Sequence, residues 1–188
     1  MCIFVKNTKT MKRLPIFITA LALVSSVAVA EELKLREDNI SQIVKAMTLE
    51  EKAHLVVGAD MKKIAVGGEV GDTNLGVPGA AGITYPIPRL GIPSIVMADG
   101  PAGLRVNVPT VGYPSGTTLA NTWDPSAMEK VTAFMGDDCN SFGVDILLAP
   151  GMNIQRYVLN GRNFEYFSED PIISGIMAAE IIKGANSE

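Results

Sequence analysis

Hydrophobic and polar positions alternate along this chain with two different periods. Residues 40–47 carry apolar side chains every three or four positions, at Ile40, Ile43, Val44 and Met47, which predicts a half-buried helix beginning near Asp38. Thr48 and Glu51 follow with the Thr-x-x-Glu spacing of a capping box, so a second short helix is expected through Leu55 and Val56. The N-terminal part of the fold is therefore predicted to be helical.

Short continuous apolar runs occur further along, at residues 93–98 (PSIVMA) and 144–149 (VDILLA). Runs of this length with β-branched residues predict strands buried on both faces, as in parallel sheets. A weaker candidate strand covers residues 117–120. Two Asp-Pro pairs, Asp124-Pro125 and Asp170-Pro171, predict helix starts, and Gly143 and Gly184 are the expected ends. The apolar stripes of these two helices are expected at Ala127, Val131, Phe134, Met135, Cys139 and Phe142, and at Ile173, Ile176, Met177 and Ile181.

Strands and helices in short alternation predict a parallel sheet with crossover helices, an α/β fold. An open doubly wound sheet and a closed (β/α)8 barrel both have this pattern, and periodicity does not choose between them. Residues 58–91 are rich in glycine and proline and are expected to form a loop. The spacing of Gly76, Gly79 and Gly82 differs from the dinucleotide-binding fingerprint, which disfavours phosphate binding there.

The first thirty residues have the layout of a secretory signal peptide. Lys12 and Arg13 precede an apolar run, residues 14–24, and Ala28-Val29-Ala30 is a small-x-small cleavage site. The run is shorter than the roughly 20 residues that a spanning helix needs. We therefore expect residues 1–30 to be a signal peptide, with Met11 as a candidate natural start, and a periplasmic or extracellular protein of residues 31–188.

Charge and cysteine content narrow the choice of partners. The chain has 16 basic and 20 acidic side chains, and four of the basic ones lie in the first thirty residues. This acidic balance argues against nucleic acid as a partner, and the lack of a basic run after residue 36 argues against a membrane surface once the signal is removed. Cys139 has no partner cysteine after residue 30, so a buried, inert thiol is expected.

Two loops, residues 99–105 and 150–170, each follow a predicted strand and carry most of the polar chemistry. In parallel α/β folds, ligands bind at the C-terminal ends of the strands, so both loops should reach the same region. Their combination of carboxylates, guanidinium groups, amides and aromatic rings suits a neutral ligand with many hydroxyls. Solvated loops held by ion pairs explain the same residues equally well. The residues are Asp99, Glu165 and Glu169; Arg105, Arg156 and Arg162; Asn153, Asn160 and Asn163; and Tyr157, Phe164, Tyr166 and Phe167.

Several other chemistries are disfavoured by composition. His54 is the only histidine, and it lies on an early helix where an ordinary surface role is expected. A zinc site and a Ser-His-Asp hydrolase are both improbable without further histidines or cysteines near the loops. Paired carboxylates remain, and glycoside cleavage is a common use of them.

Three segments make the sequence recognisable: ADGPAGLR (98–105), YPSGTTLANTWDP (113–125) and NGRNFEYFSEDP (160–171). Together with MTLEEK (47–52) and TYPIPRLGIPS (84–94), they resemble the N-terminal barrel of the family 3 glycoside hydrolases of β-glucosidase type. The match spans residues 40–188 in the family's order. The resemblance implies the first, incomplete part of a (β/α)8 TIM-like barrel, in an enzyme that hydrolyses terminal β-linked glucosides with retention of configuration and needs no cofactor or metal.

The resemblance also implies roles for particular residues. Asp99, Arg105 and Arg162 map to ligands of the sugar at the cleavage point, and Asn163 and Glu165 are candidates for supporting the pocket. The family's nucleophile and acid/base lie beyond the matched segments, so no catalytic residue is expected within the chain and the chain alone is expected to be inactive. A non-catalytic carbohydrate-binding remnant is the main alternative, and a nucleotide-binding doubly wound domain is a third.

Overall fold

The computed structural model describes residues 3–4, 32–59 and 76–187. The signal-peptide prediction falls outside them, apart from Ile3 and Phe4. Along the described residues the elements are β1 (Ile3–Phe4), α1 (Ile40–Ala46), α2 (Leu49–Val57), β2 (Gly82–Ile83), η1 (Pro88–Leu90), β3 (Val96–Asp99), α3 (Gly116–Ala120), α4 (Pro125–Phe142), β4 (Ile146–Leu148), η2 (Asn163–Glu165) and α5 (Pro171–Ala185), where η marks a 3-10 helix.

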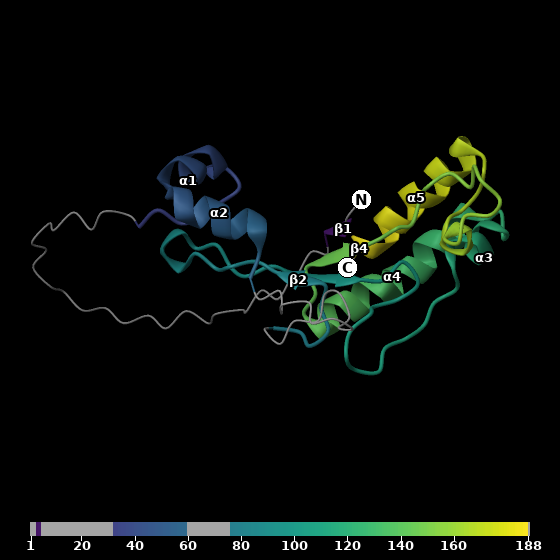
Figure 1. Ribbon diagram of the computed structural model, residues 1–188, viewed down its shortest axis with the longest axis horizontal. Coiled ribbons are helices and arrows are strands. Elements are labelled where there is room, and N and C mark those ends of the chain that lie inside the picture. The colour runs from purple at the N-terminus through teal and green to yellow at the C-terminus, as the bar shows by residue number, and fades with distance from the viewer. Residues whose placement is uncertain (1–2, 5–31, 60–75, 188) are drawn as a thin grey trace, which may run out of the picture.

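The strands form one sheet in the order β1-β4-β3-β2 (Figure 1). β3 and β4 are parallel, with Ala98 opposite Leu147, and the chain between them contains α3 and α4. β2 and β1 add to the two sides in antiparallel orientation. The predicted strands of residues 93–98 and 144–149 are therefore confirmed as a parallel pair with a helical crossover.

Helix boundaries follow the predicted capping residues. The Thr48 hydroxyl accepts from the backbone N–H of Glu51, and the Glu51 carboxylate accepts from that of Thr48, which completes the capping box. The side chains of Asp124 and Asp170 accept from Ser126 N and Ile172 N, at the starts of α4 and α5. The predicted helix starts are confirmed because each cap satisfies a backbone donor that the helix leaves free.

The described residues contain two separate clusters of buried hydrophobic side chains. The larger joins the sheet to α4 and α5 and includes Ala98, Met128, Leu147 and Met177. The smaller lies between α1, η1 and their flanking segments, and consists of Ile43, Met47, Ile87, Leu90 and Ile92. Figure 1 places α1 and α2 at one end of the molecule, with α3 and the loop around η2 at the other. The smaller cluster thus supports a separate helical lobe, away from the ends of β3 and β4.

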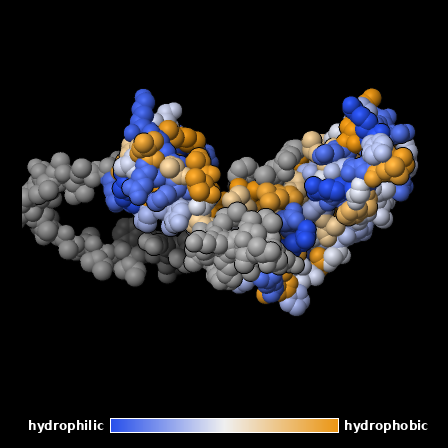
Figure 2. All heavy atoms as spheres, viewed as in Figure 1, coloured by the Kyte–Doolittle hydropathy of each residue, from blue (hydrophilic) through white to orange (hydrophobic). Residues whose placement is uncertain are grey.

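Part of the predicted apolar stripes is wrong. Ile40 and Val44 on α1, Phe134 on α4 and Ile176 on α5 are exposed. α4 instead buries Met128 and Thr132 together with Met135 and Cys139. Leu49, Val56 and Val57 of α2 are exposed as well, and apolar side chains are visible on the surface of that lobe in Figure 2.

Three local predictions also need correction. Residues 117–120 lie in helix α3, not in a strand. Residues 82–83 form β2 and residues 88–90 form η1, within the segment expected to be a loop. α5 continues one residue past Gly184, which packs against α4 instead of ending the helix. Gly143 does end α4, in the left-handed conformation with φ 72°.

Candidate functional site

The loop after β3 folds back so that Arg105 binds Asp99, the last residue of the strand. Asp99 ends β3, and its backbone carbonyl accepts from Arg105 N at 2.9 Å. The Arg105 guanidinium donates from Nη1 to the Asp99 carboxylate at 2.8 Å. Gly103 has φ 114°, and a Cβ there would lie 2.3 Å from Val111 O, so this tight turn requires glycine. The turn therefore holds a paired carboxylate and guanidinium at the strand end.

Tyr113 fastens this loop to helix α4. Its backbone N–H donates to Ala102 O at 2.9 Å, and its hydroxyl donates to the Asp138 carboxylate at 2.7 Å. Burial, followed by that hydrogen bond to Asp138, raises the pKa of Tyr113. The phenol consequently stays protonated and remains a donor throughout the neutral range.

The second loop carries the other ion pair. Arg162 Nε donates to the Glu165 carboxylate across the short helix η2. This hydrogen bond, with the charge of Glu165, raises the pKa of Arg162, and the charge of Asp99 adds to the shift. The Arg162 side chain is 70% exposed, whereas that of Glu165 is 12% exposed. Glu165 and Arg105 line the same pocket, so the two predicted loops meet there.

Asn163 is directed into its own loop. Its Nδ2 donates to Tyr157 O at 2.9 Å, and its Oδ1 accepts from Asn160 Nδ2 at 3.1 Å. These bonds give Asn163 a part in shaping the loop. Tyr166 and Phe167 are buried, with Phe167 in the main core, while Tyr157 and Phe164 are exposed. Two of the four aromatic rings considered for sugar contact are thus core residues.

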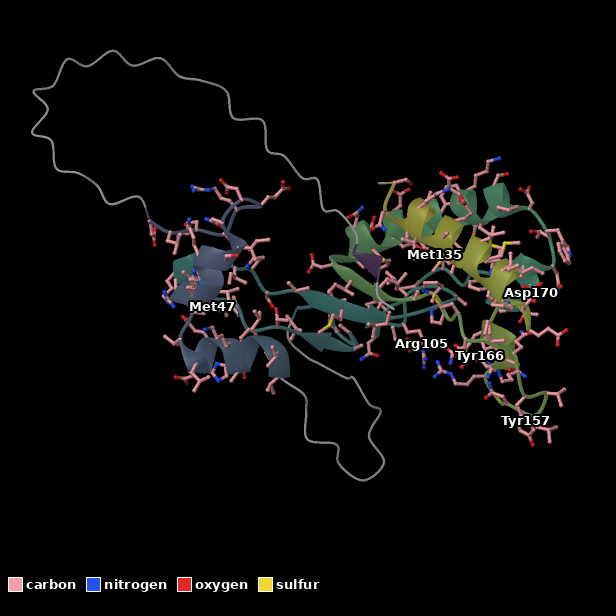
Figure 3. The ribbon with its side chains drawn as sticks, turned by 90° about the horizontal axis from the view of Figure 1, so that it is seen from above. Met47, Arg105, Met135, Tyr157, Tyr166 and Asp170 are labelled. Atoms are coloured by element: carbon pink, nitrogen blue, oxygen red, sulfur yellow. The ribbon has the colours of Figure 1, made fainter. Side chains whose placement is uncertain are left out.

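A pocket of about 170 Å³ connects the two loops. It is lined by residues 101–103 and Arg105 after β3, by Ser115 and Gly116 at the start of α3, and by Phe164 and Glu165. Figure 3 places Arg105 and Tyr166 toward the same end of the molecule, opposite Met47, with Tyr157 further out. The pocket is smaller than the about 300–1,000 Å³ typical of complete ligand sites.

Sequence reasoning missed the contribution of α3. Ser115 and Gly116 line the pocket, and Thr117 Oγ1 lies 3.1 Å from Asn163 O, whereas the hydrophobic pattern predicts a weak strand from residue 117 onward. Gln155 was missed too, and its side-chain amide donates to Asn163 O at 2.8 Å. The motif YPSGTTLANTWDP had marked this segment, but nothing in its hydrophobic pattern predicted which side chains contact the loop.

Other kinds of site find no support in the described part of the chain. Among residues 3–4, 32–59 and 76–187, no group of three or more His, Cys, Asp or Glu side chains is placed to hold a metal ion. None of the helices in that part is both long enough and apolar enough to cross a membrane. His54 lies on α2, where its ring stacks on Tyr85 with 4.8 Å between the centroids.

The fold and the site define a protein of the β/α class, with a parallel central strand pair and a pocket beside the C-terminal end of β3. Residues 35–188 match the model of the glycosyl hydrolase family 3 N-terminal domain. The chain belongs to this family, and its fold is the first part of a (β/α)8-type barrel.

Individual relatives agree with this assignment. The chain is 43% identical over 162 residues to thermostable β-glucosidase B of Acetivibrio thermocellus, covering 80% of this chain and 19% of that protein. The structure of β-glucosidase 3B from Thermotoga neapolitana in complex with glucose aligns with a TM-score of 0.72 and 45% identity, over 80% of this chain and 22% of that one. A Bifidobacterium adolescentis β-glucosidase aligns with a TM-score of 0.62 and 34% identity, over 77% and 18%. The chain thus spans about a fifth of the length of these relatives.

Proposed function

We propose that this chain forms part of a glycoside hydrolase that cleaves terminal β-linked glucosides or related β-glycosides. In this proposal Asp99, Arg105 and Arg162 bind the sugar at the cleavage point, and Glu165 supports the pocket. The observation that carries it is that one member of each of two carboxylate–guanidinium pairs, Arg105 and Glu165, lines the same pocket beside the end of β3. The relatives described as β-glucosidases, one of them in complex with glucose, support the sugar class.

The chemistry of the pairs fits a neutral polyhydroxyl ligand. A carboxylate that already accepts one hydrogen bond from Arg has further lone pairs for sugar hydroxyls, and each guanidinium has further N–H donors. A retaining glycosidase also needs a nucleophile and an acid/base, two carboxyl groups about 5–5.5 Å apart. We assign neither role to Asp99 or Glu165, whose carboxylates each accept a hydrogen bond from an arginine.

The test of this proposal is a nuclear magnetic resonance titration that measures the dissociation constant of glucose for the chain and for its Asp99→Asn variant. Asn preserves the shape but removes the charge, and a hydrogen bond to a charged group contributes about 1.5–3 kcal/mol. We expect the dissociation constant to rise at least about tenfold. Asp137→Asn, on the exposed side of α4, is the matched control and should bind as the unaltered chain does. Equal glucose affinity in both variants would remove Asp99 from the sugar site, and preferential binding of ATP would favour a nucleotide domain.

We also propose that the protein is exported to the periplasm or the cell exterior. The support is the order of Lys12-Arg13, the apolar run of residues 14–24 and the Ala28-Val29-Ala30 site. Mass spectrometry of the protein recovered from cells should then find an N-terminus at Glu31. Recovery of the chain from the cytoplasm with residues 12–30 intact would refute the proposal.

A further inference from the structure

One hydroxyl group lies among three carbonyl oxygens of the η2 loop. Thr117 Oγ1 on α3 is 3.1 Å from Asn163 O, 3.0 Å from Phe164 O and 2.7 Å from Tyr166 O. A hydroxyl has a single hydrogen, so it donates to one of these oxygens at a time, and the shortest distance favours Tyr166 O. The arrangement connects α3 to a loop that lies more than forty residues later in the chain.

Gln155 provides a second donor to the same carbonyls. Its Nε2 lies 2.8 Å from Asn163 O, 3.2 Å from Tyr166 O and 3.2 Å from Thr117 Oγ1. The two hydrogens of this amide can reach two acceptors at once, and the Thr117 oxygen can accept one of them while it donates its own hydrogen. Thr117 and Gln155 therefore form one small network on the inner side of the loop.

The segment held by this network is weak by itself. η2 spans only three residues, and its backbone bonds, Glu165 N to Arg162 O and Tyr166 N to Asn163 O, are both 3.2 Å long. Short 3-10 turns have poorer hydrogen-bond geometry than α-helices and depend on their surroundings. Gly116 confirms how closely the loop lies against α3, since a Cβ there would be 2.4 Å from Glu165 O.

We infer that Thr117 and Gln155 are positioning residues for the sugar site. They bind the backbone at both ends of η2, the turn that carries Arg162 and Glu165. They thereby fix where these two side chains stand relative to the pocket and to Asp99. The sugar-binding consequence rests on the function proposed above, whereas the anchoring of the turn rests on the hydrogen bonds alone.

The experiment compares four variants of the full chain. Thr117→Val and Gln155→Met remove the donors with little change in volume. Thr117→Ser keeps the hydroxyl and should therefore avoid the effect of Thr117→Val. Thr118→Val is the matched control, because Thr118 lies next along α3 and its exposed hydroxyl contacts only Ser115 among the hydrogen bonds described.

Two readouts separate the anchoring from the proposed function. Hydrogen–deuterium exchange of the peptide covering residues 160–167, measured without sugar, should quicken about fivefold to tenfold in Thr117→Val and Gln155→Met and stay unchanged in Thr117→Ser and Thr118→Val. Glucose affinity should fall by a similar factor in the same two variants, while exchange in α5 stays as in the unaltered chain.

Unchanged exchange of residues 160–167 in both Thr117→Val and Gln155→Met would overturn the inference, whatever the sugar result. Faster exchange with unaltered glucose affinity would overturn the positioning role. If the unaltered chain binds no glucose, the proposed function fails, and the exchange pattern alone then decides whether the anchor is real. Should Thr117→Val not fold, Gln155→Met compared with Thr118→Val still tests the anchor.

Discussion

The contact between α4 and α5 allows a sharp prediction for Gly184→Ala. A Cβ at Gly184 would lie 2.1 Å from Thr132 Oγ1 and 2.2 Å from the backbone oxygen of Glu129. Thr132 is only 1% exposed, and its hydroxyl donates to Met128 O at 2.8 Å, so it has little room to turn away. The Glu129 oxygen belongs to the helix backbone and cannot rotate. The new methyl group therefore has to push α5 away from α4.

Gly175→Ala on the same helix is the matched control. A Cβ at Gly175 meets no atom within 4 Å, so this change should only add helix propensity. Overpacking costs about 1–3 kcal/mol of stability, and because the new methyl group at Gly184 meets backbone, the cost of Gly184→Ala should lie near the upper value. Alanine in place of glycine returns up to about 1 kcal/mol in a helix interior, and less near the end of α5. The two variants should differ by about 3 kcal/mol, with Gly184→Ala destabilised and Gly175→Ala stabilised.

Thermal melts followed by circular dichroism at 222 nm test this prediction. For a chain of this length, about 2–4 °C of melting temperature corresponds to each kcal/mol, so the two variants should melt about 6–12 °C apart. Urea denaturation gives an independent measure of the same difference. If Gly184→Ala melts at or above the temperature of Gly175→Ala, the helices can separate without loss, and the reasoning from close packing is refuted.

Three shorter predictions concern a carboxylate, a thiol and a helix cap. Hydrogen bonds from Arg89, followed by the one from Thr48 N, lower the pKa of Glu51 from 4.5 to about 2. The ionised Glu51 side chain therefore contributes its full stabilisation above pH 4.5, and this is lost as the pH falls toward 2. Glu51→Gln should therefore melt with a shallower dependence on pH between 5 and 2, and an unchanged slope would contradict this. Burial raises the pKa of Cys139 to about 12, so iodoacetamide at pH 8 should label it only after denaturation, and labelling of the folded chain would contradict that. Asp170→Ala removes the bond to Ile172 N at 2.7 Å and should lower the free energy of unfolding by about 1 kcal/mol in urea, whereas Asp170→Asn should retain most of it.

Helix starts were predictable because the signals for them are local. Thr48 with Glu51, and each Asp-Pro pair, satisfy backbone donors within three residues of themselves. Residues 117–120 misled the prediction because two adjacent threonines favour strands. In the structure Thr117 bonds to the η2 loop instead, and Gly116 is needed where that loop touches α3. Both are long-range contacts that the local pattern does not contain.

The buried face of α4 shows a similar limit. Periodicity selected Phe134 because it is apolar, yet that side chain is 63% exposed. The face that packs against α5 uses Gly136 and Thr132, which allow the helix backbones to approach closely. Small and polar residues carry little weight in a hydrophobic pattern, so a contact built on them cannot be recognised from it.

The position of the candidate site was predictable, but its internal pairing was not. A strand that ends in Asp99 and a polar loop after β4 are sufficient to place both loops at the C-terminal edge of a parallel pair. The pairing of Asp99 with Arg105 depends on a turn that closes through Gly103, and the pairing of Arg162 with Glu165 depends on η2. Each loop is also held by residues outside it, Tyr113 in the first case and Thr117 on α3 in the second.

These ion pairs have a consequence for how a neutral sugar would bind. Arg105 is 75% exposed and Asp99 44%, and pairs as exposed as this contribute only about 0–1 kcal/mol to stability. Their main effect is then to orient each other, because a held carboxylate loses less rotamer freedom when a ligand arrives. A hydroxyl can bind the free lone pairs of Asp99 without breaking the pair, so sugar binding and ion pairing need not compete. An anionic ligand would instead be drawn to the guanidinium groups and repelled by both carboxylates, and for this reason the paired arrangement favours neutral sugars over phosphates.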